Sequence, residues 1–208
     1  MGRVVLTDRF AGVDNVLEIT IVTADGDHLI ANPYRNEDLF WALRGGGGGT
    51  WGVVTSVTYK THPSKPLSSA ILLANSTNAN STQNILTEII RLTPSLVEQG
   101  YGGYGGIFAG LIVLFVASPN VTAEQTQATF LPLFEFVASQ PGVSAVNSTA
   151  VYQDALSCYE TIAPFLGNVV GVPNELSSWL LPRDIVETDR PGDLAAELLK
   201  IKHPLGYL

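Results

Sequence analysis

The chain is poor in the residue types on which many protein functions depend. Its 208 residues include one cysteine, three histidines, and 11 lysines and arginines against 19 aspartates and glutamates. A single cysteine excludes an intrachain disulfide. Because Cys158 has no basic neighbour and no metal-ligand spacing, it is expected to be a small buried apolar side chain. The histidines, at positions 28, 62 and 203, are scattered and have no carboxylate at ligand spacing, so no metal site is predicted.

Basic residues are unevenly placed as well as few. Residues 1–65 hold 6 basic and 7 acidic residues (−1), whereas residues 66–208 hold 5 basic and 12 acidic residues (−7). A nucleic-acid partner requires clustered lysine and arginine, so none is expected. The apolar stretch Ile107–Ala117 is shorter than the roughly 20 residues that span a bilayer, so no membrane segment is predicted either.

No set of catalytic residues stands out. The sequence contains no Gly-x-Ser-x-Gly motif, so a serine-hydrolase nucleophile elbow is absent. Asp25 and Asp27 form a carboxylate pair, but turn chemistry around Gly26 explains them better than acid–base catalysis. Four tyrosines are predicted to pack in or on a sheet, with the lining of a substrate pocket as the alternative. These are Tyr101, Tyr104, Tyr152 and Tyr159.

The most informative feature present is the run of five glycines Gly45–Gly49, which leads through Gly52 into the strand-like segment Val53–Lys60. Glycine lets the backbone approach another group closely, at an entropic cost. Residues 47–52 match the spacing Gly-x-Gly-x-x-Gly of dinucleotide-binding sites. That motif needs a strand before the glycines and a helix after them.

The order in this chain is the reverse, because a helix is predicted before the glycines. Asn36 is a candidate N-cap, Arg44 lies in the predicted last turn, and Gly45 is expected at the C′ position. Phe40 and Trp41, on this helix, are expected to be packing residues. A nicotinamide-type site is therefore disfavoured, and the lack of Lys-Ser or Lys-Thr after the glycines excludes a P-loop.

Three segments together resemble a known family. Residues 38–55, from Asp-Leu-Phe-Trp-Ala-Leu-Arg through the glycines to Gly-Val-Val-Thr, closely resemble the berberine-bridge-enzyme-like flavin oxidases. These have the vanillyl-alcohol-oxidase type of FAD fold, with a PCMH-type FAD-binding domain. The hairpin segment 14–26 is similar to the same family, and Ser177–Arg183 resembles its fungal members.

The resemblance implies FAD as cofactor and a fragment of the family pattern. The flavin-attachment residues and the phosphate loop would precede Met1, and the catalytic base would follow Leu208, so the chain alone is not expected to hold FAD tightly. The resemblance places backbone contacts to FAD in the glycine segment. The candidate cofactor-binding residues are Gly45, Gly46, Gly52, Val53 and Val54.

The patterns predict an α+β fold in two parts. Residues 1–64 are expected to be the C-terminal part of the FAD-binding domain, with a hairpin at Asp25–Gly26. Residues 65–208 are expected to be the first part of a substrate domain, an antiparallel sheet covered by helices. The segments expected there are strands Ser69–Ala74, Ile107–Ala117 (buried on both faces) and Val143–Tyr152, loops Asn75–Thr82 and Tyr101–Gly106, and helices Asn84–Val97 (bent or ended at Pro94), Thr122–Ser139 and Leu194–Lys202.

Four Asn-x-Ser/Thr sequons exceed the number that chance gives for this composition and favour a secreted glycoprotein. They lie at Asn75, Asn80, Asn120 and Asn147. The sequence thus predicts a fragment of an FAD-dependent oxidase of a hydroxyl or amine carbon, with O2 as acceptor and a small-molecule substrate. The alternatives are a truncated pseudoenzyme and a non-enzymatic secreted glycoprotein. The oligomeric state is left open.

Overall fold

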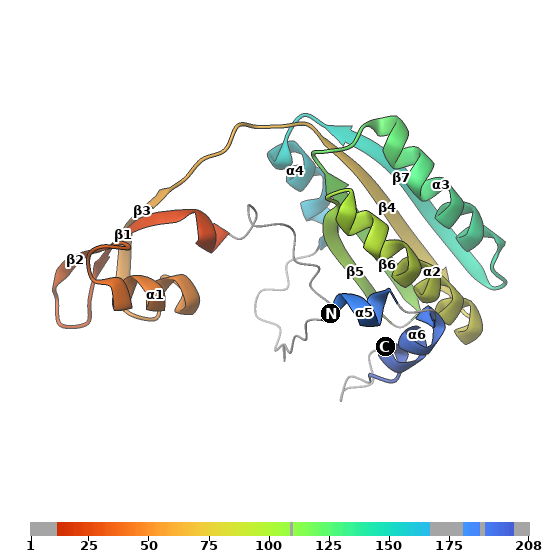
Figure 1. Ribbon diagram of the computed structural model, residues 1–208, viewed down its shortest axis with the longest axis horizontal. Helices are drawn as coiled ribbons and strands as arrows, with labels where there is room; N and C mark the ends of the chain where they lie inside the picture. Colours follow the sequence, from red (N-terminus) through yellow and green to blue (C-terminus); the bar gives the residue numbers. More distant parts are fainter. Residues whose placement is uncertain (1–11, 109, 167–180, 188–189, 202–208) are drawn as a thin grey trace. The chain divides into compact units, whose positions relative to one another are not determined.

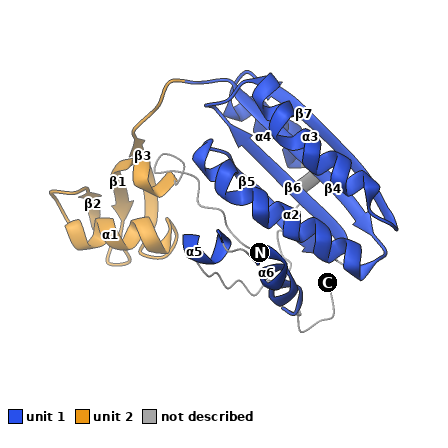
Figure 2. Cartoon of the chain, turned by 45° about the vertical axis from the view of Figure 1, so that its right-hand side comes forward, with its two compact units in different colours: residues 1–5, 64–208 blue, residues 6–63 orange. Residues whose placement is uncertain are grey.

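A computed structural model describes residues 12–108, 110–166, 181–187 and 190–201, apart from the side chains of residues 108 and 164–166 (Figure 1). The chain separates into two compact units, residues 6–63 and residues 64–208 together with the first five (Figure 2). Each unit has its own antiparallel sheet and its own helices, so the predicted α+β class is confirmed. No described helix has the length and the apolar character needed to cross a membrane.

The described part of the smaller unit is a three-stranded sheet with the α-helix α1 (Glu37–Gly46) and the short 3-10 helix η1 (Gly12–Asn15). Strands β1 (Val16–Val22), β2 (His28–Ala31) and β3 (Val53–Tyr59) pair antiparallel in the order β2-β1-β3. The turn between β1 and β2 has Gly26 at φ 87°, and the amide of Thr23 donates to the carbonyl of Asp27 at 2.9 Å. This confirms the hairpin predicted from Asp25–Gly26 and the turn role of the two aspartates.

The larger unit contains a four-stranded antiparallel sheet in the order β5-β6-β4-β7. The strands are β4 (Leu67–Ser76), β5 (Gly102–Phe108), β6 (Leu111–Ser118) and β7 (Val143–Tyr152). None of the four contains a charged residue or a histidine. Alternate residues point to opposite faces, and only the face that carries Ala70, Leu72 and Ala74 is packed into the main core.

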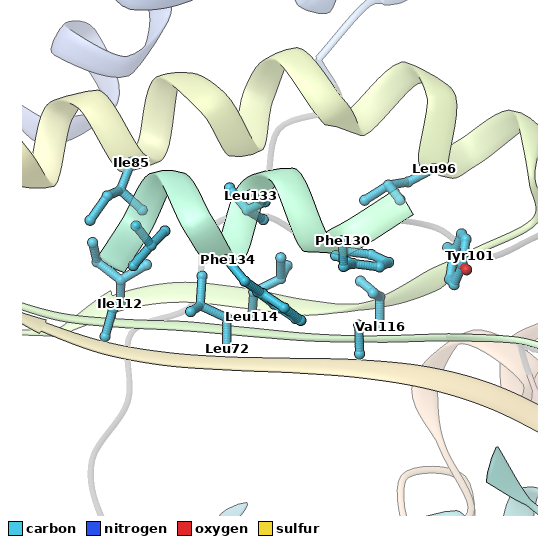
Figure 3. Close-up of a cluster of buried hydrophobic side chains, with 13 residues drawn as sticks. Leu72, Ile85, Leu96, Tyr101, Ile112, Leu114, Val116, Phe130, Leu133 and Phe134 are labelled. Atoms are coloured by element: carbon cyan, nitrogen blue, oxygen red, sulfur yellow. The ribbon is translucent and has the colours of Figure 1, made fainter. Parts of the chain in front are cut away.

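Helices α2 (Ala79–Glu98) and α3 (Ala123–Ser139) cover that face. Figure 3 shows Phe130 and Phe134 of α3 above Leu72, Leu114 and neighbouring strand residues. The ring of Tyr101 meets Phe130 edge-on at 5.5 Å between centroids, and its hydroxyl is 2.6 Å from that of buried Thr126. The capping box of Thr122 and Gln125, predicted from sequence, begins α3.

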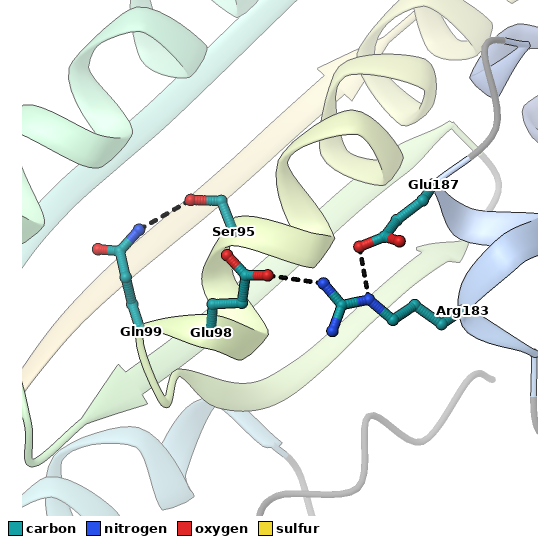
Figure 4. A network of polar contacts seen from close by, with 5 residues as sticks. All are labelled: Ser95, Glu98, Gln99, Arg183 and Glu187. Carbon is teal, nitrogen blue, oxygen red and sulfur yellow. Dashed lines mark hydrogen bonds and ion pairs between the residues drawn. The ribbon is translucent and has the colours of Figure 1, made fainter.

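The described residues of this unit form three further helices, α4 (Ala155–Leu166), α5 (Arg183–Val186) and α6 (Pro191–Leu199). Helix α6 packs on α2, where Ala195 is fully buried. Arg183 of α5 donates from one nitrogen to Glu98 at the end of α2 and from another to Glu187, both at 2.6 Å (Figure 4). These side chains are exposed, so the ion pairs position α5 but add little stability.

The structure corrects two predicted segments in the sheet. Residues 101–106 are not a loop, since β5 begins at Gly102. The apolar run Ile107–Ala117 is not one strand buried on both faces. It is a hairpin that turns at Gly110 (φ 89°), and β6 alternates between buried and more exposed residues. The sequence does not show where this turn lies, because both strands and the turn between them consist of apolar residues and glycine.

The helices also differ from the prediction. Strand β4 extends to Ser76 and α2 begins at Ala79, so the segment 75–82 is not a loop. The side chain of Asn78 caps α2 by accepting from the amides of Asn80 and Ser81. Pro94 lies within α2 and does not end it. Helix α4 was not predicted, and the last helix begins at Pro191 and ends at Leu199 instead of spanning 194–202.

Candidate functional site

The glycine segment lies between α1 (Glu37–Gly46) and β3. Helix α1 is amphipathic and buries Phe40 and Leu43 against β1 and β2. The guanidinium of Arg44 fixes the end of the helix, because it donates to the carbonyl of Val13 at 3.0 Å and pairs with Asp14 at 3.3 Å. The guanidinium also stands 5.4 Å from the centre of the Phe40 ring. The glycines therefore start from an anchored helix end.

The helix ends later than the sequence predicts. Gly45 and Gly46 are helical, and Gly47 has a positive φ (85°), with its amide donating to the carbonyl of Leu43 at 3.1 Å. The hydroxyl of Thr50 closes the end by donating to the carbonyl of Gly46 at 2.6 Å. The predicted C′ role of Gly45 is therefore wrong.

The N-cap position predicted for Asn36 is confirmed, but its side chain does not cap the helix. Its own backbone is left-handed (φ 51°), and its side-chain amide donates to the carbonyl of Ile30 at 2.8 Å. The side chain thus ties the helix start to β2, which sequence spacing alone does not show.

Gly52 is required by the packing of its own unit. Its φ is +148°, and a Cβ there would stand 2.2 Å from the carbonyl oxygen of Val22 and 3.0 Å from the Cα of Thr23. The first pair of β3 with β1, Val53 opposite Val22, follows directly. The close approach expected for Gly52 is therefore one to backbone of β1, where no side chain can be accommodated.

Part of the remaining segment is open, whereas a Cβ on Gly46 would stand 2.9 Å from the indole nitrogen of Trp51. A Cβ on Gly45, Gly47 or Gly49 would meet nothing within 4 Å. Within the described part of the chain, no hydrogen bond uses the amide N–H of Gly48, Gly49 or Trp51. Unused backbone donors in a glycine-rich segment can approach a bulky or anionic group directly. Residues 45–51, which comprise the last two residues of α1 and the turn that follows, are called the glycine loop below.

The described side chains at and beside the glycine loop include two valines and two tryptophans, which bind by contact and do not act as acids or bases. Val53 is 69% exposed, and Val54 packs against the small core from its edge. Trp51 is half-exposed, and its indole nitrogen lies near Gly46. Trp41 is 80% exposed, so its predicted packing role is wrong, whereas buried Phe40 fulfils it. The described residues hold no cluster of three or more metal-ligating side chains.

The tyrosines do not converge on one site. Tyr101 is in the core, where burial raises the pKa of its phenol. Tyr104 on β5 and Tyr159 on α4 are exposed, and Tyr152 is partly buried at the end of β7. Cys158 is buried in α4, as predicted, and burial raises the pKa of its thiol, which disfavours the reactive thiolate. His203 and residues 177–180 lie outside the described residues.

No protein-family profile matches the chain, but individual relatives do. An uncharacterised FAD-linked oxidoreductase of Arthroderma benhamiae is 38% identical over 191 residues, 88% of this chain and 33% of the relative. The FAD-linked oxidoreductase ffsJ of Aspergillus flavipes is 33% identical over 189 residues, 90% of this chain and 30% of the relative. The chain is a homologue of the FAD-linked oxidoreductases. It spans about a third of the length of these two relatives.

The fold agrees with this homology. The VAO-type flavoprotein MtVAO615 of Myceliophthora thermophila C1 superposes on 89% of this chain and 34% of its own, with a TM-score of 0.65 and 27% identity. MtVAO713 from the same source covers 74% of this chain with a TM-score of 0.59 and 28% identity. The resemblance stated from residues 38–55 is confirmed, and FAD is the cofactor named for these homologues.

Proposed function

We propose that the chain is part of an FAD-dependent oxidoreductase and that its glycine loop, with Gly52, Val53 and Val54, contributes backbone contacts to FAD. The observation that carries this proposal is the open geometry of the loop, in which amides of Gly48, Gly49 and Trp51 have no acceptor. The alternative role, a turn needed only for packing, accounts for Gly52 but not for three glycines that face open space.

The residues present fit part of such a site. FAD combines a flat ring system with an anionic pyrophosphate, and backbone N–H groups without neighbouring Cβ atoms suit both. Arg44 is already committed to Val13 and Asp14, so the loop offers amide donors rather than a free cation. A loop of this kind supports binding but is insufficient for a tight site, which agrees with the expectation that the chain alone holds FAD weakly.

In this proposal FAD supplies the hydride-accepting chemistry. The chain's own residues bind and orient, and none of them is assigned a proton-transfer role. The whole protein would oxidise a hydroxyl or amine carbon of a small molecule, with O2 as the acceptor. Residues 1–64 would belong to the FAD-binding domain and residues 65–208 to the substrate domain.

Titration of the chain with FAD tests the loop assignment. In a 15N-labelled sample at millimolar FAD, we expect amide shifts in residues 45–54 and weak affinity, without a flavin band in the purified protein. Gly49→Asp should abolish the shifts while the fold is kept, because a Cβ at Gly49 meets nothing within 4 Å and the carboxylate repels the pyrophosphate.

Gly12→Asp is the matched control, since Gly12 is also exposed and open and the added charge is the same. It should leave the FAD-induced shifts unchanged. Shifts that are spread over both units, or that survive in Gly49→Asp, would contradict the assignment of the glycine loop to FAD.

We also propose that the protein enters the secretory pathway and carries N-linked glycans. All four sequon asparagines are exposed. Asn80 lies in the first turn of α2, Asn120 follows β6, and Asn75 and Asn147 lie within strands. Glycans extend into solvent, so exposed asparagines are the positions that can hold them.

Secretion from a eukaryotic host should therefore yield a chain that is heavier than its sequence mass and that loses mass on treatment with an N-glycosidase. We expect occupancy at Asn80 and Asn75, read from the deamidated peptides. Substituting Asn80 by Gln should remove one glycan without loss of secretion. Secreted material of unmodified mass would rule out the glycoprotein assignment.

A further inference from the structure

The two residues of the glycine loop that are not glycine, Thr50 and Trp51, both fold back on the end of α1. The hydroxyl of Thr50 donates to the carbonyl of Gly46 at 2.6 Å, and its amide donates to the carbonyl of Gly47 at 3.4 Å. The indole nitrogen of Trp51 lies so near Gly46 that a Cβ there would stand 2.9 Å from it. Two side chains therefore close the turn onto the end of the helix.

These contacts are local, since they join residues 46–51 to one another within one continuous segment of the chain. The shape of the turn is therefore specified by the loop itself and does not depend on other parts of the protein. A run of glycines needs such restraints, because glycine loses more conformational freedom on ordering than any other residue. Thr50 and Trp51 supply them.

Trp51 is not a residue of the small core. It is 50% exposed and does not belong to the cluster of buried and partly buried apolar side chains around Phe40 and Leu43. Within the described part of the chain its indole N–H has no hydrogen-bond acceptor, so the ring is held by packing alone. Removal of the ring should therefore loosen the turn without unfolding the unit.

We propose that Trp51 is a positioning residue for FAD. Its indole, seated against Gly46, holds residues 47–49 in the turn that presents the free amides of Gly48 and Gly49. The proposal rests on the proposed function, in which these amides contact FAD. A turn that is ordered before the cofactor arrives binds it more tightly than a turn that must be ordered during binding.

The proposal also gives Gly46 a different role from its neighbours. Gly46 is helical and has no positive φ, so its backbone would accept a side chain, and alanine would favour the helix. What excludes a side chain is the indole of Trp51, whereas a Cβ on the adjacent Gly45 would meet nothing within 4 Å. Gly46 is therefore the seat of the indole and not itself a contact to FAD.

Two measurements on the 15N-labelled chain test the positioning role, amide relaxation without FAD and an FAD titration followed at Gly48 and Gly49. Trp51→Ala should lower the order parameters of residues 47–49. It should also raise the Kd for FAD by at least about fivefold, because the freed turn must be ordered on binding. Tyr34→Ala is the matched control, since it removes an exposed aromatic ring from the same unit. It should change neither quantity.

Two further variants separate packing of the ring from direct contact with FAD. Trp51→Phe keeps a ring against Gly46 but lacks the N–H, and its Kd should stay within about twofold of the wild-type value. Gly46→Ala should displace the indole and raise the Kd about as much as Trp51→Ala does. In the Trp51→Ala background Gly46→Ala should add nothing, because both changes break the same contact.

Unchanged order parameters in Trp51→Ala would overturn the positioning role whether or not FAD binds. A loss in Trp51→Phe as large as that in Trp51→Ala would make the indole N–H a direct contact to FAD, and additive effects of Gly46→Ala and Trp51→Ala would do the same for Gly46. Either result would overturn the proposal. A wild-type chain with an ordered turn but no FAD-induced shifts would instead contradict the proposed function, and the positioning role with it.

Discussion

Substitution of Gly52 by valine is expected to unfold the smaller unit. A Cβ at this position would stand 2.2 Å from the carbonyl oxygen of Val22, well inside van der Waals contact, and φ is +148°. Both backbones belong to the β1–β3 pairing, so neither can move without separating the strands. Steric overlap plus backbone strain predicts a loss of at least about 3 kcal/mol in the free energy of unfolding of this unit.

Chemical denaturation followed by tryptophan fluorescence measures this loss, since Trp41 and Trp51 both belong to the smaller unit. Gly49→Val is the control, because a Cβ at Gly49 meets nothing within 4 Å. It should cost less than about 1 kcal/mol. Equal stability of the two variants would show that Val22 does not constrain Gly52. A stable Gly52→Val chain that lost only its FAD response would instead assign Gly52 to the cofactor.

The sequence identified the glycine segment but not how its glycines differ. Composition shows five adjacent glycines and a sixth at position 52. Only the register of β3 on β1 reveals that Gly52 is fixed by packing, while Gly45, Gly47 and Gly49 face open space. Register depends on contacts between segments about 30 residues apart, which local propensity does not encode.

Short sequence motifs correctly predicted the turns and helix starts that depend on turn-forming or capping residues. The Asp25–Gly26 turn and the box of Thr122 with Gln125 lie where expected. The prediction failed where the same amino-acid composition is compatible with both a loop and a strand. Tyr-Gly-Gly-Tyr-Gly-Gly is typical of a loop, yet residues 102–108 are a strand because β6 supplies its partners. Trp41 shows the same limit, since helical periodicity does not say which side of a helix is covered.

The glycines of β5 give the second large effect, because two of them occupy opposite situations in one strand. A Cβ on Gly103 would lie 1.8 Å from the carbonyl oxygen of Phe115 on β6. A Cβ on Gly105 would meet its nearest atom, a methyl carbon of Leu114, at 3.7 Å, which is ordinary contact. Comparison of the glycine-to-alanine change at these two positions therefore distinguishes a steric requirement for glycine from a general preference of this strand for glycine.

Gly103→Ala is expected to break the β5–β6 pairing near Tyr101 and to cost at least about 3 kcal/mol. Gly105→Ala should be neutral or slightly stabilising, because alanine reduces the freedom of the unfolded chain. Denaturation monitored by near-ultraviolet dichroism, together with hydrogen exchange of β5 and β6, distinguishes local from global loss. If Gly103→Ala were as stable as Gly105→Ala, the close approach of β5 to Phe115 would be wrong. Residues 102–106 would then be better described as the loop that their composition predicts.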